Sequence, residues 1–137
     1  MSNYFGAAGS AIYSTLSGGT ALTTLLGGTL IYQDHPPDGS ARPYVVFNHQ
    51  AGGPELLNSH DIRSNVWYVR GFADTKASAV AIDAQIDALL DGHTLSVSGY
   101  TNFWTKREED LSIVETQPNN ERIYSNGGLY RVRVTDG

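Results

Sequence analysis

The stretch from Ile62 to Leu90 limits the possible folds more than any other part of the chain. Residues 62–72 alternate between two faces, as a β-strand does, and at roughly 3.3 Å per residue this strand exceeds about 30 Å. Asp74 and Thr75 then begin the longest predicted helix, which runs to Leu90 or Asp91 and ends at Gly92. The fold must therefore combine a long strand with a long helix.

Weaker periodicities predict the other elements. Ala7 to Leu16 has helical spacing, and Thr20 is the expected N-cap of a second short helix that ends at Gly27. The β-branched and aromatic runs predict the remaining strands. In chain order these strands are 30–32, 44–47, 95–100, 111–116, 123–124 and 129–135.

Glycine, proline and charged residues predict where the chain turns. Residues 34–43 form a loop, Gly52-Gly53-Pro54 marks a turn followed by polar residues to about His60, and Asn126-Gly127-Gly128 is typical of a tight hairpin. The mixed charges of residues 106–110 predict a solvated strand end or loop. Runs of strands around one major helix indicate an α+β fold: a mainly antiparallel sheet with the long helix and the short N-terminal helices on one face.

Composition excludes several classes of protein. The 137 residues suit a single domain, 1–137, and no cysteine is present for a disulfide or a thiolate site. We expect no membrane span and no secretory signal, because long apolar runs are absent. The net charge of −5 argues against binding nucleic acid through its phosphates.

A search for catalytic chemistry finds little. Asp34-His35 and His60-Asp61 are adjacent pairs that could serve a metal-dependent hydrolase, but further ligands at helical spacing are missing. No nucleophile elbow or phosphate-binding glycine loop occurs. Trp67 with Arg131 and Arg133 would make a stacking surface only on neighbouring strands. We therefore expect no catalytic residues, no metal and no cofactor.

The long helix carries two further stripes beside its apolar one. Asp83, Asp87 and Asp91 place like charges at i, i+4 steps, which destabilises a helix slightly. A solvated acidic face is one interpretation, and a surface that repels a polyanion or meets a basic partner is the other. The second stripe consists of small residues, which either pack against the first helix or contact another subunit: Ala77, Ala81, Ala84 and Ala88.

The order of these landmarks resembles the tail-completion proteins, or tail terminators, of long-tailed double-stranded DNA phages. The resemblance spans nearly the whole chain, and Pro-Tyr-Val-Val after an Ile-Tyr strand is its most specific part. It rests on the Thr20 to Gly27 segment, Ile31-Tyr32, Arg42 to Phe47, Val66-Trp67-Tyr68, the helix with Ile82, Ile86 and Leu89, and Tyr130 to Val134. Residues 50–60 and 118–128 match nothing in the family.

The resemblance implies a structural protein of the virion, made in the host cytoplasm. Such proteins form a ring, expected here to be a hexamer, that caps the tail tube, stops its polymerisation and meets the head-side connector or stopper protein. DNA passes through the lumen without specific binding, and an acidic lumen would let it slide. Asp83, Asp87 and Asp91 are therefore candidate lumen or subunit-interface residues, as are the four alanines.

Other interpretations remain open. A neck protein, a stopper or adaptor between portal and tail, would have the same size, acidity and fold class. A small hydrolase that uses Asp34, His35, His60 and Asp61 and a monomeric ligand-binding domain belong to different functional classes.

Overall fold

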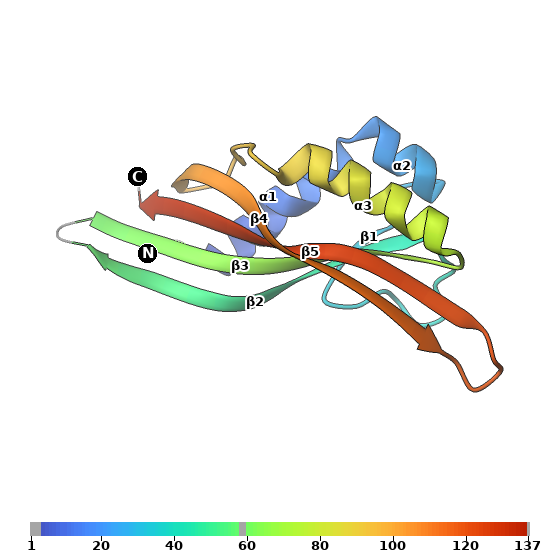
Figure 1. Ribbon diagram of the computed structural model, residues 1–137. Coiled ribbons are helices and arrows are strands. Elements are labelled where there is room, and N and C mark those ends of the chain that lie inside the picture. The colour runs from blue at the N-terminus through green and yellow to red at the C-terminus, as the bar shows by residue number, and fades with distance from the viewer. Residues whose placement is uncertain (1–3, 58–59, 137) are drawn as a thin grey trace.

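Long strands dominate the architecture (Figure 1). The computed structural model describes the backbone of residues 4–57 and 60–136, and the side chains of these residues except 54–57, 60–61 and 136. The elements within this part of the chain are α1 (Tyr4–Ser17), α2 (Thr20–Leu26), β1 (Ile31–Gln33), β2 (Tyr44–Leu57), β3 (His60–Ala73), α3 (Lys76–Leu90), β4 (Tyr100–Thr116) and β5 (Arg122–Asp136).

The strands form one sheet in the order β1-β2-β3-β5-β4. Every pairing is antiparallel except that of β1 with β2, which is parallel. The three helices of the described residues lie together on one face of the sheet, and none of them covers the other face (Figure 1). The predicted α+β class, with helices on one face of a mainly antiparallel sheet, is confirmed.

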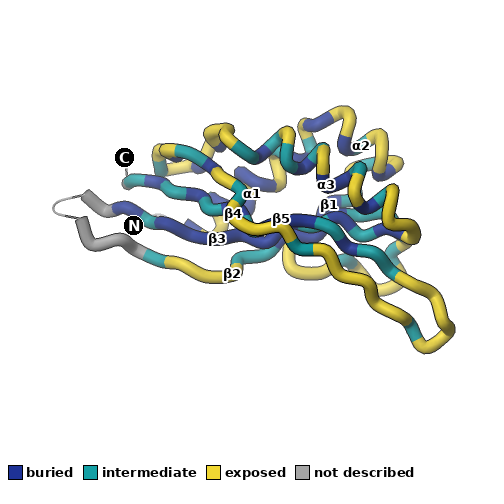
Figure 2. Tube along the Cα trace, viewed as in Figure 1, coloured by how far each residue is buried: buried dark blue, intermediate teal, exposed yellow. Residues whose placement is uncertain are grey.

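The core lies between the helices and the sheet (Figure 2). The predicted apolar stripe of α3 faces this core, with Ile82, Ile86 and Leu90 fully buried. Trp67 and Tyr130 are the largest buried side chains of the sheet. The Thr75 side chain accepts a hydrogen bond from Ser78 N, so the predicted N-cap of α3 is confirmed.

Three glycine-based predictions are wrong. The chain does not turn at Gly52-Gly53-Pro54, because β2 continues through these residues to Leu57, with an irregularity between His49 and Ala51. It does not turn at Asn126-Gly127-Gly128, which lies within β5. The N-cap of α2 is Gly19 and not the predicted Thr20. Residue 19 has to be a glycine, because a Cβ placed there would lie 2.5 Å from the Leu89 side chain.

The predicted division of the region after α3 is also wrong. Residues 95–99 are irregular, although Leu95 and Val97 are buried. A single strand, β4, then runs from Tyr100 to Thr116 and includes the charged residues 106–110 that predicted a strand end or loop. The β4–β5 hairpin turns at residues 117–121, between the predicted strands 111–116 and 123–124.

Candidate assembly surfaces

The two Asp–His pairs do not share a site. Asp34 follows β1 and its backbone N donates to Phe47 O at 2.9 Å, whereas His60 pairs with Leu57 at the far end of β2. The ten residue steps along β2 from Phe47 to Leu57 separate the two pairs by about 30 Å. Among the described residues, no group of three or more His, Asp or Glu side chains is placed to hold a metal ion.

The stacking surface of Trp67 with the two arginines does not form either. Their strands β3 and β5 are neighbours, but Trp67 pairs with Tyr130 and both lie in the core under the helices. Arg131 and Arg133 alternate with the buried Val132 and so lie on the opposite, helix-free face. Arg131 is instead paired with Glu108, Nε to Oε2 2.7 Å.

Asp83 is the buried member of the acidic stripe. Its side chain is 11 % exposed and accepts two hydrogen bonds from the Arg107 guanidinium, at 2.7 Å from Nη1 and 3.0 Å from Nη2. Asn126 Nδ2 donates to the same carboxylate at 2.7 Å. Asp83 therefore does not present a free carboxylate to a lumen or to a neighbouring subunit.

Arg107 connects this carboxylate to both strands beneath α3. Its Nη1 donates to the Tyr130 hydroxyl and its Nη2 to Gly127 O, each at 2.9 Å, while Nε donates to Asp110 at 2.6 Å. The hydrogen bond to Asp83 is the main reason that the pKa of Arg107 is raised further above its ordinary value. Two-point contacts of this kind are among the strongest in proteins.

Asp87 and Asp91 are paired as well but remain partly open to solvent. The Tyr130 hydroxyl donates to Asp87 Oδ1 at 3.0 Å, and burial raises the pKa of that hydroxyl. Asp91 accepts the backbone N–H of Arg107 at 2.9 Å and lies 3.8 Å from Lys106 Nζ. The acidic stripe thus fastens α3 to β4 and β5, and these contacts offset the repulsion between like charges that the sequence predicts.

The alanine stripe does not pack against α1. Ala77, Ala84 and Ala88 are exposed and Ala81 is half-buried, so the prediction of packing within the subunit is wrong. Leu89, on another side of α3, lies against Gly19 at the start of α2. The stripe is therefore available for contact with another molecule.

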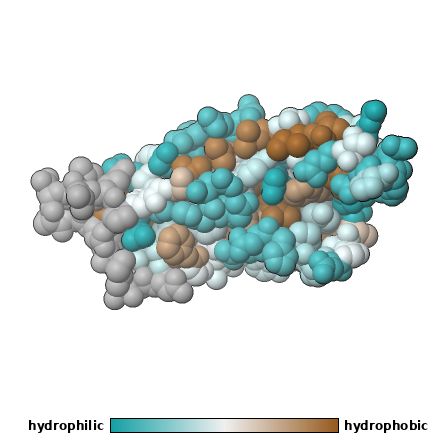
Figure 3. Space-filling view, turned by 90° about the horizontal axis from the view of Figure 1, so that it is seen from below, coloured by the Kyte–Doolittle hydropathy of each residue, from teal (hydrophilic) through white to brown (hydrophobic). Residues whose placement is uncertain are grey.

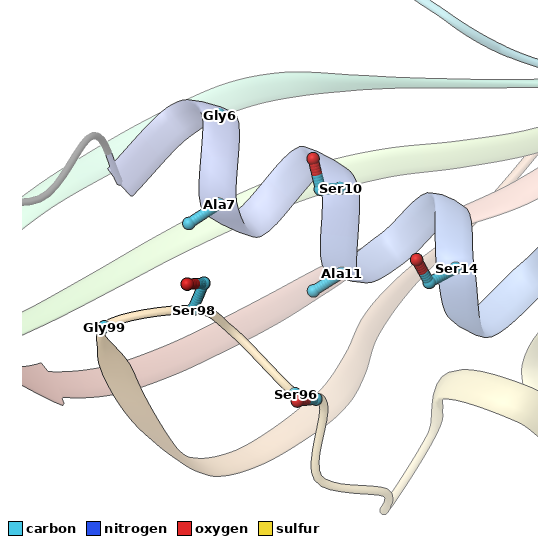
Figure 4. Close-up of a pocket in the computed structure, with 8 residues that line it drawn as sticks. All are labelled: Gly6, Ala7, Ser10, Ala11, Ser14, Ser96, Ser98 and Gly99. Atoms are coloured by element: carbon cyan, nitrogen blue, oxygen red, sulfur yellow. The ribbon is translucent and has the colours of Figure 1, made fainter.

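A groove of about 430 Å³ runs along α1 and is lined by small, uncharged residues (Figure 4). Ala7 and Ala11 point from the helix toward the irregular segment that carries Ser96 and Ser98. Phe5 and Tyr13 of α1 are also exposed.

Sequence reasoning missed this surface, although a signal exists. Residues 1–33 contain no Asp, Glu, Lys, Arg or His. Depletion of charge, with exposed aromatic residues, is typical of the buried centre of protein interfaces. The exposed side of α1 therefore has the composition of an assembly surface.

The chain was compared with known proteins. The model of the family described as "Tail completion protein gp17" matches residues 10–134. A solved structure described as "Virion of native gene transfer agent (GTA) particle" contains a chain with the same fold. The TM-score is 0.80 at 20 % sequence identity, and the match covers 98 % of this chain and 99 % of the other. No curated protein matches.

Proposed function

This chain belongs to the tail completion protein gp17 family, and from that premise we propose that it forms a ring that caps the phage tail tube. In this role it ends tube polymerisation and joins the tail to the connector on the head side. The family match over residues 10–134 is the observation that carries the proposal. Family membership by itself makes the chain a structural protein of the virion tail.

The surfaces of the chain suit a ring of identical subunits, for which six copies is the expectation. A closed cyclic ring needs two different surfaces on each copy, because subunits meet head to tail. The described residues offer two candidates of this kind: the uncharged side of α1, and the alanine stripe of α3 beside β4. The outer edge of β4 pairs with no other described strand, but Gly92 N and the Asp91 carboxylate already bond the backbone of Thr105 and Arg107 on this edge.

The partly exposed Asp87 and Asp91 are the residues we assign to the lumen. Their side chains are 43 % and 36 % exposed, and α3 has no cation after Lys76. An acidic lining would repel the phosphates of DNA and favour passage without specific binding. Asp83 takes no part in this lining, because Arg107 neutralises it within the subunit.

A neck protein, which would act as a stopper or adaptor between portal and tail, is the second candidate for the same fold. The hydrolase alternative has no comparable support, because the two Asp–His pairs lie at opposite ends of β2. No helix among the described residues has the length and apolarity to cross a bilayer.

The proposal is tested by adding the purified chain to polymerising tail tube protein and following tube length by electron microscopy. If the chain is a cap, elongation ends at molar concentrations of the chain far below that of the tube protein, and a ring is seen at one end of each tube. A neck protein leaves tube length unchanged. Elongation that is unaffected, with no density at either tube end, would contradict the proposal.

The lumen assignment needs a separate measurement. Replacing Asp87 and Asp91 together by Asn keeps an acceptor for the Tyr130 hydroxyl and for the backbone N–H of Arg107, so ring assembly should remain intact. DNA ejection should become slower, because the lining no longer repels phosphates. The matched control replaces the exposed Asp38 by Asn and the exposed Glu109 by Gln, which changes the net charge equally. DNA ejection at the wild-type rate in the Asp87/Asp91 variant would contradict the assignment.

A further inference from the structure

Arg70 lies on the helix-free face of the sheet, held between two aromatic rings. Val69 is buried under the helices, so alternation along β3 places Arg70 on the opposite face. Its Cζ lies 4.5 Å from the centroid of the Tyr68 ring and 4.9 Å from that of Phe72. Cation–π contacts on both sides fix the guanidinium in one position.

This guanidinium has no carboxylate partner in the part of the chain that the structure describes. The ion pairs found there involve Arg42, Lys106, Arg107 and Arg131. The Arg70 Nε is buried and meets no acceptor among the described residues. A half-buried guanidinium whose donors are unused is costly in a monomer, and it is a ready site for a carboxylate.

The surroundings of Arg70 are aromatic. The rings of Tyr44 and Phe72 are 5.2 Å apart, and Tyr32 continues the row at 6.1 Å from Tyr44. Figure 3 views this face, where hydrophilic side chains lie beside a hydrophobic area. Tyrosine, phenylalanine and arginine together are typical of the residues that carry most of the binding energy in protein interfaces.

The chain also carries a segment suited to such a surface. The end of the β4–β5 hairpin, residues 113–125, forms an arm. Its tip, residues 115–123, extends beyond the last β3–β5 pair, Ala73 with Tyr124, as a two-stranded ribbon at the right of Figure 1. An ion pair of Arg42 with Glu121, 3.5 Å, connects this arm to the body of the domain. A ribbon of two strands is marginally stable in water without further packing.

Glu115 and Ile113 point to the same side of this arm. Ser112 contacts Lys76 of α3, so Ile113 and Glu115 face away from the helices. Ile113 is exposed, and the exposed Glu115 makes no ion pair with another described residue. The arm therefore presents an apolar side chain beside an unused carboxylate, as the complement of the aromatic row beside Arg70.

We propose that the arm of one copy docks on the helix-free face of the next copy, with Glu115 accepting hydrogen bonds from Arg70 and Ile113 packed on Phe72 and Tyr44. The inference rests on the proposed ring and adds a further contact between its neighbouring subunits. Opposite charges favour a second copy as the occupant. DNA is disfavoured, because the chain has a net charge of −5.

The test exchanges the two charges. Arg70→Glu and Glu115→Arg each place like charges in every subunit contact. Each variant alone should therefore have the mass of a monomer in multi-angle light scattering. Mixed in equal amounts, the two variants should regain the mass of the assembled species, because every contact in an alternating ring then joins opposite charges. The double variant should assemble alone for the same reason. Circular dichroism checks that each variant is folded.

Matched controls make the same changes of charge nearby. Arg122→Glu alters an exposed arginine of the arm, and Glu109→Arg alters an exposed glutamate of β4; both should assemble as the wild type does. Assembly by the single variants, or no recovery on mixing, would overturn the inference and leave the ring intact. Wild-type protein that stays monomeric even with tail tubes would overturn the ring itself. Loss of binding to a DNA duplex by Arg70→Glu, with unchanged mass, would assign Arg70 to nucleic acid instead.

Discussion

Arg107 is the residue on which the polar contacts between α3 and the sheet converge. Its guanidinium reaches Asp83, Asp110, Tyr130 and the carbonyl of Gly127. Few waters can replace these partners, because the Arg107 and Asp83 side chains are only 14 % and 11 % exposed. Loss of the Arg107 charge leaves the buried Asp83 carboxylate without an ionic partner, with Asn126 as its remaining side-chain donor.

Replacing Arg107 by Met should therefore lower the free energy of unfolding by about 3–5 kcal/mol. The matched control is Lys106→Ala, which removes an exposed ion pair with Asp91 at 3.8 Å. It should lower the free energy of unfolding by less than about 1 kcal/mol. Urea denaturation of the two variants measures both values. Equal losses would contradict a special role for Arg107.

His49 makes stability depend on pH. Its Nε2 lies 2.8 Å from Asn65 Nδ2, and its ring packs edge-on against Trp67. Burial, and then the charge of Arg63, lowers the pKa of His49 below its ordinary value. The unfolded chain therefore binds more protons than the native one as pH falls below about 6.5, so the free energy of unfolding decreases there.

As the pH falls from 7.5 to 5.5, the free energy of unfolding of the wild-type protein should decrease. The contribution of His49 to this decrease is at most about 1 kcal/mol per pH unit. The His49→Gln variant should lose less over the same interval. Urea titrations at the two pH values measure the difference, with the exposed His35→Gln as control. An identical pH dependence in wild type and His49→Gln would contradict the assignment.

At the scale of elements, glycines allow neighbouring strands to approach closely rather than turn. A Cβ at Gly127 would lie 2.2 Å from Val69 O and 2.6 Å from Arg70 Cα, both backbone atoms of β3. At Gly128, a Cβ would occupy space that the Arg107 side chain fills, 2.7 Å from its Nε. The absence of a side chain thus allows β3 to lie close to Gly127 and the Arg107 side chain to lie close to Gly128.

Gly127→Ala should consequently destabilise the protein by about 1–3 kcal/mol, because β5 must move away from β3. Gly53→Ala is the matched control: it also lies in a strand, but nothing lies within 4 Å of a Cβ placed there. Its effect should be near zero or slightly stabilising. Thermal unfolding followed by circular dichroism compares the two, and equal melting temperatures would contradict this explanation.

Local signals in the sequence predicted the elements that local chemistry determines. Thr75 and Gly92 correctly predicted where α3 begins and ends. The alternation of residues 130–134 correctly predicted a strand there. The lengths of β2 and β5 could not be predicted, because Gly52 and Gly127 allow close contact with another strand and do not mark turns. The length of β4 could not be predicted, because its charged residues 106–110 lie within the strand and do not end it. Asp83 and Arg107 are 24 residues apart, so their pairing has no local signature.

At the scale of the whole molecule, one face of the sheet is covered by helices and the other is open. The sequence predicted this arrangement because the apolar stripe of α3 and the short helices before it indicate a single helical layer. It did not predict what the open face carries, since the row from Tyr32 to Arg70 is assembled from three strands. Open faces rich in aromatic residues are typical of proteins that act in assemblies.

The central claim is that this chain ends tail tube polymerisation. The most direct test deletes its gene from the phage and records the length distribution of tail tubes in the lysate by electron microscopy. The account predicts over-long tubes with a broad distribution, and tails of normal length when the wild-type gene is supplied in trans. Tails of normal length detached from heads would assign the chain to the neck, and intact infectious virions would contradict the account.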